Sequence, residues 1–125
     1  VKNEEKLKKG LQEIENLKEA SKDLDVRPDS EGYQDLMLAF DLQASLVSSE
    51  STLISALSRE ESRGAHQRDD YKEISNDFTV NMRVQFDSDD NILLSKDNVP
   101  ALNKHLKDLI TKTKEIDNFE GMLLE

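Results

Sequence analysis

The 125-residue chain contains no cysteine, which excludes disulfide bonds, a thiolate nucleophile and a cysteine-ligated zinc site. Tryptophan is also absent and aromatic residues make up only 5%, so a core has to be built mainly from aliphatic side chains. No apolar run approaches the roughly 20 residues that a membrane-spanning helix needs, and no signal peptide is visible. The lack of cysteine fits a reducing compartment, and we expect no direct insertion into a membrane.

Basic residues are scarce, with 17 against 27 acidic ones, which gives a formal net charge of -10. An acidic surface repels phosphate groups, so we expect no nucleic-acid partner and no anionic membrane partner. Solvation of charged faces explains most of this acidity. The length suits one domain, which we expect to span residues 1–125.

Two stretches have the hydrophobic spacing of helices. Residues 3–26 place their leucines and Ile14 on one face, and "VRPDSEG" at 26–32 breaks the pattern because Pro28 disfavours helical geometry before it. Within this break, Asp29 or Ser30 is expected to cap the next helix. Residues 31–63 are the most apolar part of the chain. The polar run at 48–52 predicts a kink or turn there, with Ser49 capping a further segment.

These patterns predict a three-helix region over 1–64 that ends at Gly64, a natural helix stop. A loop is expected over 65–77. The period then changes to strict alternation at 78–86, which predicts a strand, and "ILLS" at 92–95 predicts its partner, so we expect a β-hairpin over 78–96.

The segment "DSDDN", residues 87–91, has the acidic look of a calcium loop, but it lacks the glycine and the terminal glutamate that such a loop needs. We therefore interpret it as the turn of the hairpin. A last amphipathic helix is expected over 100–120, opening at Asn98-Val99-Pro100.

Both signs of charge crowd around Gly64 in "SREESRGAHQRDDYKE", residues 58–73. Gly64 permits a sharp change of chain direction, which would place Arg63, His66 and Arg68 beyond a helix end, where cations suit the negative pole of the helix dipole. Spacing alone leaves two interpretations open. One is a helix cap followed by a solvated charged loop; the other is an inward-facing salt-bridge network that fastens this domain to another.

The longer stretch "ALSREESRGAHQRDDYKE", residues 56–73, closely resembles a segment of the flavoprotein subunits of succinate dehydrogenase and fumarate reductase. L-aspartate oxidase and adenylylsulfate reductase flavoproteins are similar here, though less close. Lys72 stands where the family usually has proline. This departure leaves the path of the loop open. The residues that match are Ala56, Leu57, Arg59, Glu61, Ser62, Arg63, Gly64, Ala65, His66, Arg68, Asp70 and Tyr71.

The resemblance implies a mainly α fold: a three-helix, spectrin-like bundle with a short β-hairpin and an additional C-terminal helix. It implies that the chain is the C-terminal helical domain of a longer flavoprotein, which interconverts succinate and fumarate using FAD. The expected partners are the flavin-binding and capping domains of the same parent chain and an iron–sulfur subunit of the parent complex. The expected location is cytoplasmic, or at the inner face of the membrane through partner subunits.

The resemblance assigns FAD and the catalytic residues to the parent's other domains, so we expect no catalytic, cofactor-binding or metal-binding residue in these 125 residues. It implies a domain-docking motif instead, made by Arg59, Glu61, Ser62, Arg63, Gly64, His66, Arg68 and Asp70. The alternative is a free-standing acidic helical module whose terminal helix binds a partner helix.

Overall fold

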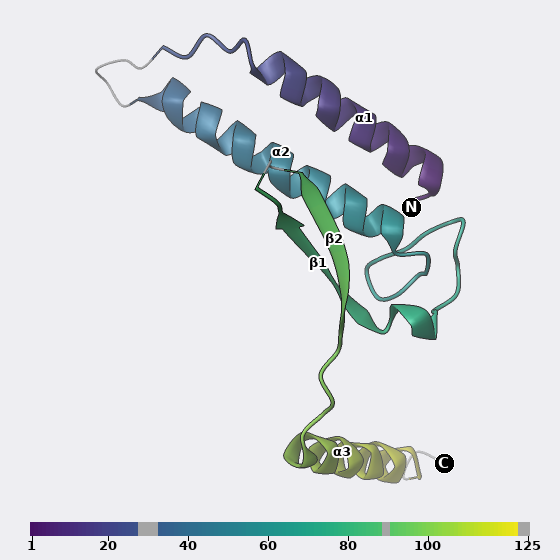
Figure 1. The fold of residues 1–125 in the computed structure, drawn as a ribbon. Helices are drawn as coiled ribbons and strands as arrows, with labels where there is room; N and C mark the ends of the chain where they lie inside the picture. Colours follow the sequence, from purple (N-terminus) through teal and green to yellow (C-terminus); the bar gives the residue numbers. More distant parts are fainter. Residues whose placement is uncertain (28–32, 89–90, 123–125) are drawn as a thin grey trace.

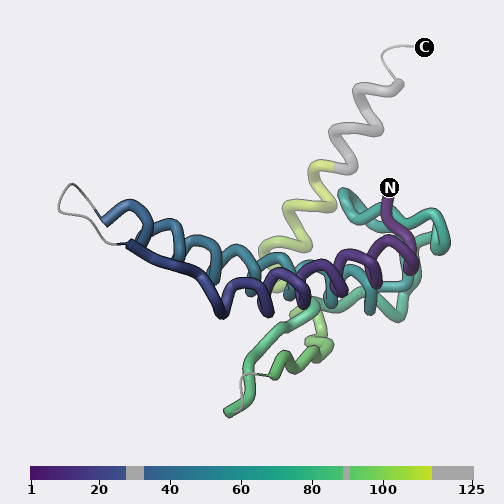
Figure 2. Tube along the Cα trace, turned by 90° about the horizontal axis from the view of Figure 1, so that it is seen from above, coloured from purple at the N-terminus to yellow at the C-terminus, as the bar shows by residue number. Residues whose placement is uncertain are grey.

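The computed structural model describes residues 1–27, 33–88 and 91–122, with side chains as far as Thr113. Two long helices, α1 and α2, lie side by side, and a β-hairpin crosses below α2 (Figure 1). A third helix, α3, stands apart at the end of an extended segment (Figures 1 and 2). In the described residues the fold is therefore mainly α, with a two-stranded hairpin and an additional C-terminal helix, as predicted.

Helix α1 spans Glu4–Ser21. Its first turn is capped by Asn3, whose side-chain oxygen accepts a hydrogen bond from the Lys6 backbone N–H at 2.9 Å. The predicted helix over 3–26 is too long at its C-terminal end, where Asp23 and Asp25 follow. Aspartate favours non-helical geometry and its negative charge is unfavourable at the negative pole of a helix, so α1 ends before them.

Helix α2 spans Gln34–Ser58 without interruption, so the predicted kink or turn at 48–52 is wrong. The hydroxyl groups of this run bond inside the helix: Ser51 Oγ donates to the Val47 carbonyl and Thr52 Oγ1 to the Ser48 carbonyl, both at 2.8 Å. A hydroxyl that returns its hydrogen bond to the preceding turn does not cap a new helix. Ser49 is thus mid-helix, and residues 1–64 contain two helices in their described part rather than three.

The predicted break at 28–32, with its caps Asp29 and Ser30, lies outside the described residues. The first described residue after it is Tyr33, which is the N-cap of α2 and has a left-handed backbone conformation with φ of 53°.

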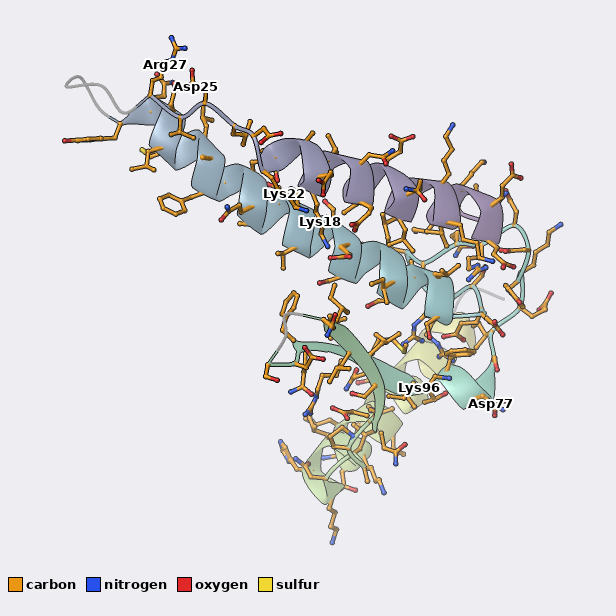
Figure 3. The ribbon with its side chains drawn as sticks, turned by 45° about the horizontal axis from the view of Figure 1, so that its top comes forward. Lys18, Lys22, Asp25, Arg27, Asp77 and Lys96 are labelled. Carbon is orange, nitrogen blue, oxygen red and sulfur yellow. The ribbon has the colours of Figure 1, made fainter. Side chains whose placement is uncertain are left out.

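The two helices pack through small and aliphatic side chains. Leu7 of α1 and Leu46 and Ala56 of α2 are buried, with 4%, 6% and 7% of their surface exposed. Gly10 lets the helices approach closely, because a Cβ at this position would lie 3.2 Å from Leu53 Cδ1. An ion pair ties the other end of the contact: Lys18, labelled in Figure 3 between the helices, lies 2.5 Å from a carboxylate oxygen of Glu50.

Strands β1 (Val80–Phe86) and β2 (Ile92–Asn98) form an antiparallel hairpin in which Val80 pairs with Asn98 and Phe86 with Ile92. The predicted turn at 87–91 is supported in its described part. The Asp87 backbone N–H donates to the Asn91 carbonyl at 3.0 Å, and the Asn91 N–H donates to the Asp87 carboxylate at 2.9 Å. Residues 89–90 lie outside the described residues.

The predicted first strand begins two residues too early, because Phe78 belongs to a short 3₁₀ helix, η1 (Asn76–Phe78). The ring is buried, with 8% exposed, and is contacted by two cations: Arg59 lies 5.8 Å and Lys96 Nζ 3.9 Å from its centre. Figure 3 labels Lys96, which belongs to β2, and Asp77, which belongs to η1. Burial of the ring takes Phe78 out of the strand.

Helix α3 spans Lys104–Met122 and begins later than Pro100. Asn103 caps it, since its side-chain oxygen accepts from the Leu106 backbone N–H at 2.9 Å. That residues 1–125 form one domain, made of a helical region, a loop, a hairpin and a terminal helix, remains a prediction.

Replacement of Leu46 by alanine should lower the free energy of unfolding by about 2–4 kcal/mol, because it leaves a cavity between α1 and α2. The matched control is Met37→Ala in the same helix, which removes a side chain that is 61% exposed and should cost less than about 1 kcal/mol. Chemical denaturation followed by circular dichroism measures both. Equal losses in the two variants would show that the α1–α2 contact is not the core.

Candidate functional site

The charged segment folds back beneath the C-terminal end of α2, beside the N-terminus of the chain (Figure 1). Helix α2 already ends at Ser58, with Arg59 as its C-cap, so Gly64 is not the helix stop that the sequence predicts. Gly64 instead lies in a tight turn, in which Arg63 and His66 exchange backbone hydrogen bonds of 2.8 and 2.9 Å. Its φ of 55° is left-handed, a conformation that glycine adopts without steric cost.

Glu61 is the most deeply buried residue of this segment, with 0% of its surface exposed. Its carboxylate accepts from Arg63 Nε at 2.9 Å, from Arg59 Nη1 at 2.5 Å and from the backbone N–H of Ser75 at 2.9 Å. The hydrogen bond from Arg63 is the main cause that lowers the pKa of Glu61 to about 2, against the opposing effect of burial, with help from Ser75 and Arg59. The carboxylate is therefore ionised and satisfied.

The same two arginines reach past Glu61 to the chain beyond it. Arg59 donates from Nη1 to the Phe78 carbonyl at 2.8 Å and from Nη2 to the Val80 carbonyl at 2.7 Å. Arg63 donates from Nη2 to the Ser75 carbonyl at 3.0 Å. These charge-assisted bonds fix η1 and the start of β1 against the end of α2.

Arg68 and Asp70 form a second ion pair, with Nε–Oδ1 and Nη2–Oδ2 distances of 2.9 and 2.6 Å. Arg68 is 2% exposed. Its Nη1 donates to carbonyls at the end of α2, at 2.8 Å to Leu57 and 3.2 Å to Ala56. The Asp70 carboxylate accepts from the backbone N–H of Glu4 at 2.8 Å. One ion pair thus lies between the negative pole of α2 and the positive pole of α1.

The pKa values of this pair move apart, because their mutual hydrogen bonds raise that of Arg68 and lower that of Asp70. His66 takes part through its ring: Nε2 lies 3.2 Å from the Arg59 carbonyl and donates to it. Burial lowers the pKa of His66, which favours the neutral ring.

Sequence reasoning missed the part played by Lys2 and by several backbone groups. The Lys2 N–H donates to the Gln67 carbonyl at 3.2 Å, and the Asp69 N–H donates to the Lys2 carbonyl at 2.8 Å, which joins the N-terminus to the charged segment. Ser62 Oγ holds the segment from within, since it donates to the Tyr71 carbonyl at 2.7 Å and accepts from the Arg68 N–H at 2.9 Å. Residue types do not reveal which backbone groups will become hydrogen-bond partners in the folded chain.

The structure brings all eight predicted site residues into one connected cluster. The interpretation as a solvated charged loop is wrong, because Glu61, Ser62 and Arg68 are buried. The inward-facing network is present: Arg59, Glu61, Ser62, Arg63, Gly64, His66, Arg68 and Asp70 bond or turn within this chain. That the cluster fastens this domain to another remains a prediction.

The described glycines do not form the glycine-rich loop that cradles the phosphates of a dinucleotide. Gly10 and Gly121 lie in helices, Gly64 lies in the turn described above, and Gly32 is outside the described residues. None of the described glycines sits between a strand and a helix, where a phosphate-binding loop requires one. We therefore derive no flavin chemistry from this chain.

Within the described ranges, no group of three or more histidine or acidic side chains is arranged to hold a metal ion. None of the helices described is both long and apolar enough to cross a membrane.

The pKa of Glu61 falls from 4.5 to about 2 on folding, so its ionised form stabilises the fold. This stabilisation is complete above pH 4.5 and is lost as the pH falls toward 2. The Glu61→Gln variant should have a lower melting temperature at neutral pH and a flatter dependence of that temperature on pH in this window. Glu13→Gln, at an exposed position of α1, is the control and should follow the parent curve. A Glu61→Gln curve parallel to the parent's would contradict the assignment.

Replacement of Gly64 by alanine should lower the free energy of unfolding by about 1–2 kcal/mol, because a side chain in the left-handed conformation is strained. A Cβ here meets no atom within 4 Å, so the cost comes from the backbone alone. Gly64→Asn should be milder, since asparagine tolerates this conformation better. Denaturant titration distinguishes the two, and an equal loss in both would argue against the positive φ.

Comparison with known proteins gives one consistent result. The family described as "Fumarate reductase flavoprotein C-term" matches residues 1–117. An uncharacterized FAD-dependent oxidoreductase of Methanocaldococcus jannaschii is 33% identical over 85 residues, which cover 68% of this chain and 15% of that protein.

Two solved structures are similar in fold and are each 26% identical: a mutant of E. coli quinol fumarate reductase FrdA, with a TM-score of 0.72, and a quinol-fumarate reductase with menaquinol molecules, with a TM-score of 0.73. Each match covers 82% of this chain and 18% of the other. The chain thus spans less than a fifth of the length of these relatives. From its match over residues 1–117, together with the shared fold, the chain belongs to the fumarate reductase flavoprotein C-terminal family.

Proposed function

We propose that this chain is the C-terminal domain of a flavoprotein that interconverts succinate and fumarate using FAD, and that it acts as a structural and docking element. Membership of the family supports the proposal, and so does the short share that the chain covers of an FAD-dependent oxidoreductase and of two fumarate reductases. In this proposal FAD and the catalytic residues belong to other domains of the parent.

The observation that carries the proposal is an open apolar face that runs from the N-cap of α2 to just past the middle of the helix. Tyr33, Met37, Phe40 and Val47 follow helical spacing and are 58%, 61%, 63% and 40% exposed. Folded monomers rarely expose contiguous apolar surface of this kind, and such patches mark interaction sites. We call this set the α2 face.

In the part of the chain that the structure describes, α2 packs against α1 and the hairpin, and no third helix packs on this pair because α3 stands apart (Figures 1 and 2). A spectrin-like bundle needs a third helix on the open side. In our proposal an element of the parent flavoprotein outside these residues packs on the α2 face and completes the bundle.

The charged cluster supports docking by holding the elements of the chain in place. Its buried bonds hold α1, α2, η1 and β1 in fixed positions, so a partner meets a preformed surface. Gly64 and Ala65 at the tip of the turn are exposed, and Arg63 is partly exposed, so this edge of the cluster is accessible to the parent's flavin-binding and capping domains. The proposed iron–sulfur subunit would receive electrons from the parent's flavin and not from this chain.

The test uses the full-length flavoprotein of the proposal, in which Phe40→Asp should disrupt docking because it places a charge in a buried apolar contact. We expect a lower temperature of flavin release and a lower flavin content. The matched control is Ile74→Asp, which alters a side chain of similar exposure, 63%, away from the α2 face.

Both variants should lower the free energy of unfolding of the isolated chain by less than about 1 kcal/mol, because both side chains are exposed. Flavin release that is the same in Phe40→Asp and Ile74→Asp would contradict docking through the α2 face. A flavin-bound spectrum, or turnover of succinate by this chain alone with FAD and an electron acceptor, would contradict the structural role.

A further inference from the structure

A cleft of about 320 Å³ opens between the turn at 63–66, the end of η1 and the start of β1. Its polar lining comes from three groups that carry or can accept positive charge and from two neutral hydrogen-bonding side chains. These are Arg59, Arg63, His66, Thr79 and Asn81. Apolar side chains complete the wall, and the described residues that line the cleft include no carboxylate. In a chain with a net charge of -10, this is an unusual local excess of cations.

The ion pairs of the two arginines also show an excess of positive charge at the cleft. Glu61 is the carboxylate that serves both Arg59 and Arg63, so two guanidinium groups share one negative charge. Arg68, the neighbouring arginine, differs because it has its own carboxylate in Asp70. One positive charge at the cleft is therefore left without a matching carboxylate in the described part of the chain.

Arg63 carries this charge toward the cleft. Its Nε and Nη2 are engaged by Glu61 and the Ser75 carbonyl, whereas Nη1 has no hydrogen-bond partner among the described residues. The Arg63 side chain is 38% exposed, against 15% for Arg59. Thr79 Oγ1 lies 3.4 Å from Nη2, which places a hydroxyl beside the free edge of the guanidinium. The N–H groups of Nη1 remain available, so the guanidinium can donate a charge-assisted hydrogen bond to a carboxylate oxygen at the cleft.

We propose that this cleft binds the carboxylate of an aspartate or glutamate side chain from another domain of the parent flavoprotein, through Arg63 Nη1 with Thr79 and Asn81 alongside. The inference rests on the proposed function, which it deepens by naming the chemistry of the contact. A free dicarboxylate has the same chemistry, but one uncompensated charge at an open surface binds a free anion weakly. A side chain in the same polypeptide reaches the cleft at high effective concentration, which removes that difficulty.

The test adds a negative charge to the cleft without touching the network. Asn81 is exposed and lines the cleft, so Asn81→Asp should repel the incoming carboxylate. Gln85→Asp is the matched control: it adds the same charge to an exposed position of β1 that does not line the cleft. In the full-length flavoprotein, Asn81→Asp should lower the temperature of flavin release by about 2–4 °C relative to Gln85→Asp. Asn81 pairs with Asp97 across the hairpin, so the melting temperature of the isolated chain is measured for both variants, and any difference caused by repulsion between residues 81 and 97 is subtracted.

Salt provides a second readout. Added NaCl should lower the temperature of flavin release in the parent protein and in Gln85→Asp, and should have less effect in Asn81→Asp, where the ionic contact is already lost. Equal flavin release and equal salt dependence in the two variants would overturn the inference. If Phe40→Asp still loosens docking in that case, the proposed function stands and only the carboxylate contact fails; if it does not, both fail.

The free anion is tested on the isolated chain by titration with succinate and, separately, acetate. Nuclear magnetic resonance shifts of the Arg63, Thr79 and Asn81 backbone amides report binding in the cleft. We expect no saturable shift at low millimolar concentration. Saturable shifts at these amides would assign the cleft to a free carboxylate ligand and overturn the assignment to a protein side chain.

Discussion

A carboxylate that water cannot reach has to be paired with donors, and the fold beyond α2 depends on this requirement at Glu61. Its donors come from the C-cap of α2, from the turn at 63–66 and from the segment before η1, so one buried charge holds three parts of the chain at once. Arg59 and Arg63 then use their remaining bonds on backbone carbonyls, which carries the same constraint into the hairpin. These bonds form a network within one chain. Glu61 is ionised when the chain is folded, because the network supplies the donors that its carboxylate needs.

The turn and the position of the cations beyond a helix have local signals in the sequence, whereas the eight residues of the cluster were assigned from the family resemblance. Glycine between charged residues predicts a turn, and arginines that follow a helix predict contacts with its last carbonyls. The structure has both features, at Gly64 and Arg68. The rest could not be predicted from residue types. The carbonyls of Phe78 and Val80 that receive Arg59 are chemically the same as any others, and only the folded chain shows which ones lie within reach.

Two of the wrong predictions, the break at 48–52 and the early start of β1, have a common cause: in each, a side chain with two possible partners was assigned the wrong one. Serine and threonine hydroxyls at 48–52 can cap a helix or bond to the preceding turn, and in α2 they bond to the turn. Phe78 fits the alternation of β1, yet its ring is buried below two cations and leaves the ladder. Hydrophobic periodicity did locate α1, the hairpin and α3 along the chain, although it misplaced the C-terminal end of α1 and the starts of β1 and α3.

The hydrogen bond from the Glu4 backbone to Asp70 joins residues 66 positions apart in the chain. A contact of this separation forms only after the entropy of closing a long loop has been overcome, whereas each helix can form from local contacts. The first turn of α1 is therefore finished by a residue that is synthesised long after it. This contact ties the beginning of the chain to a residue near its middle, where Arg68 and Asp70 hold the two helix ends together.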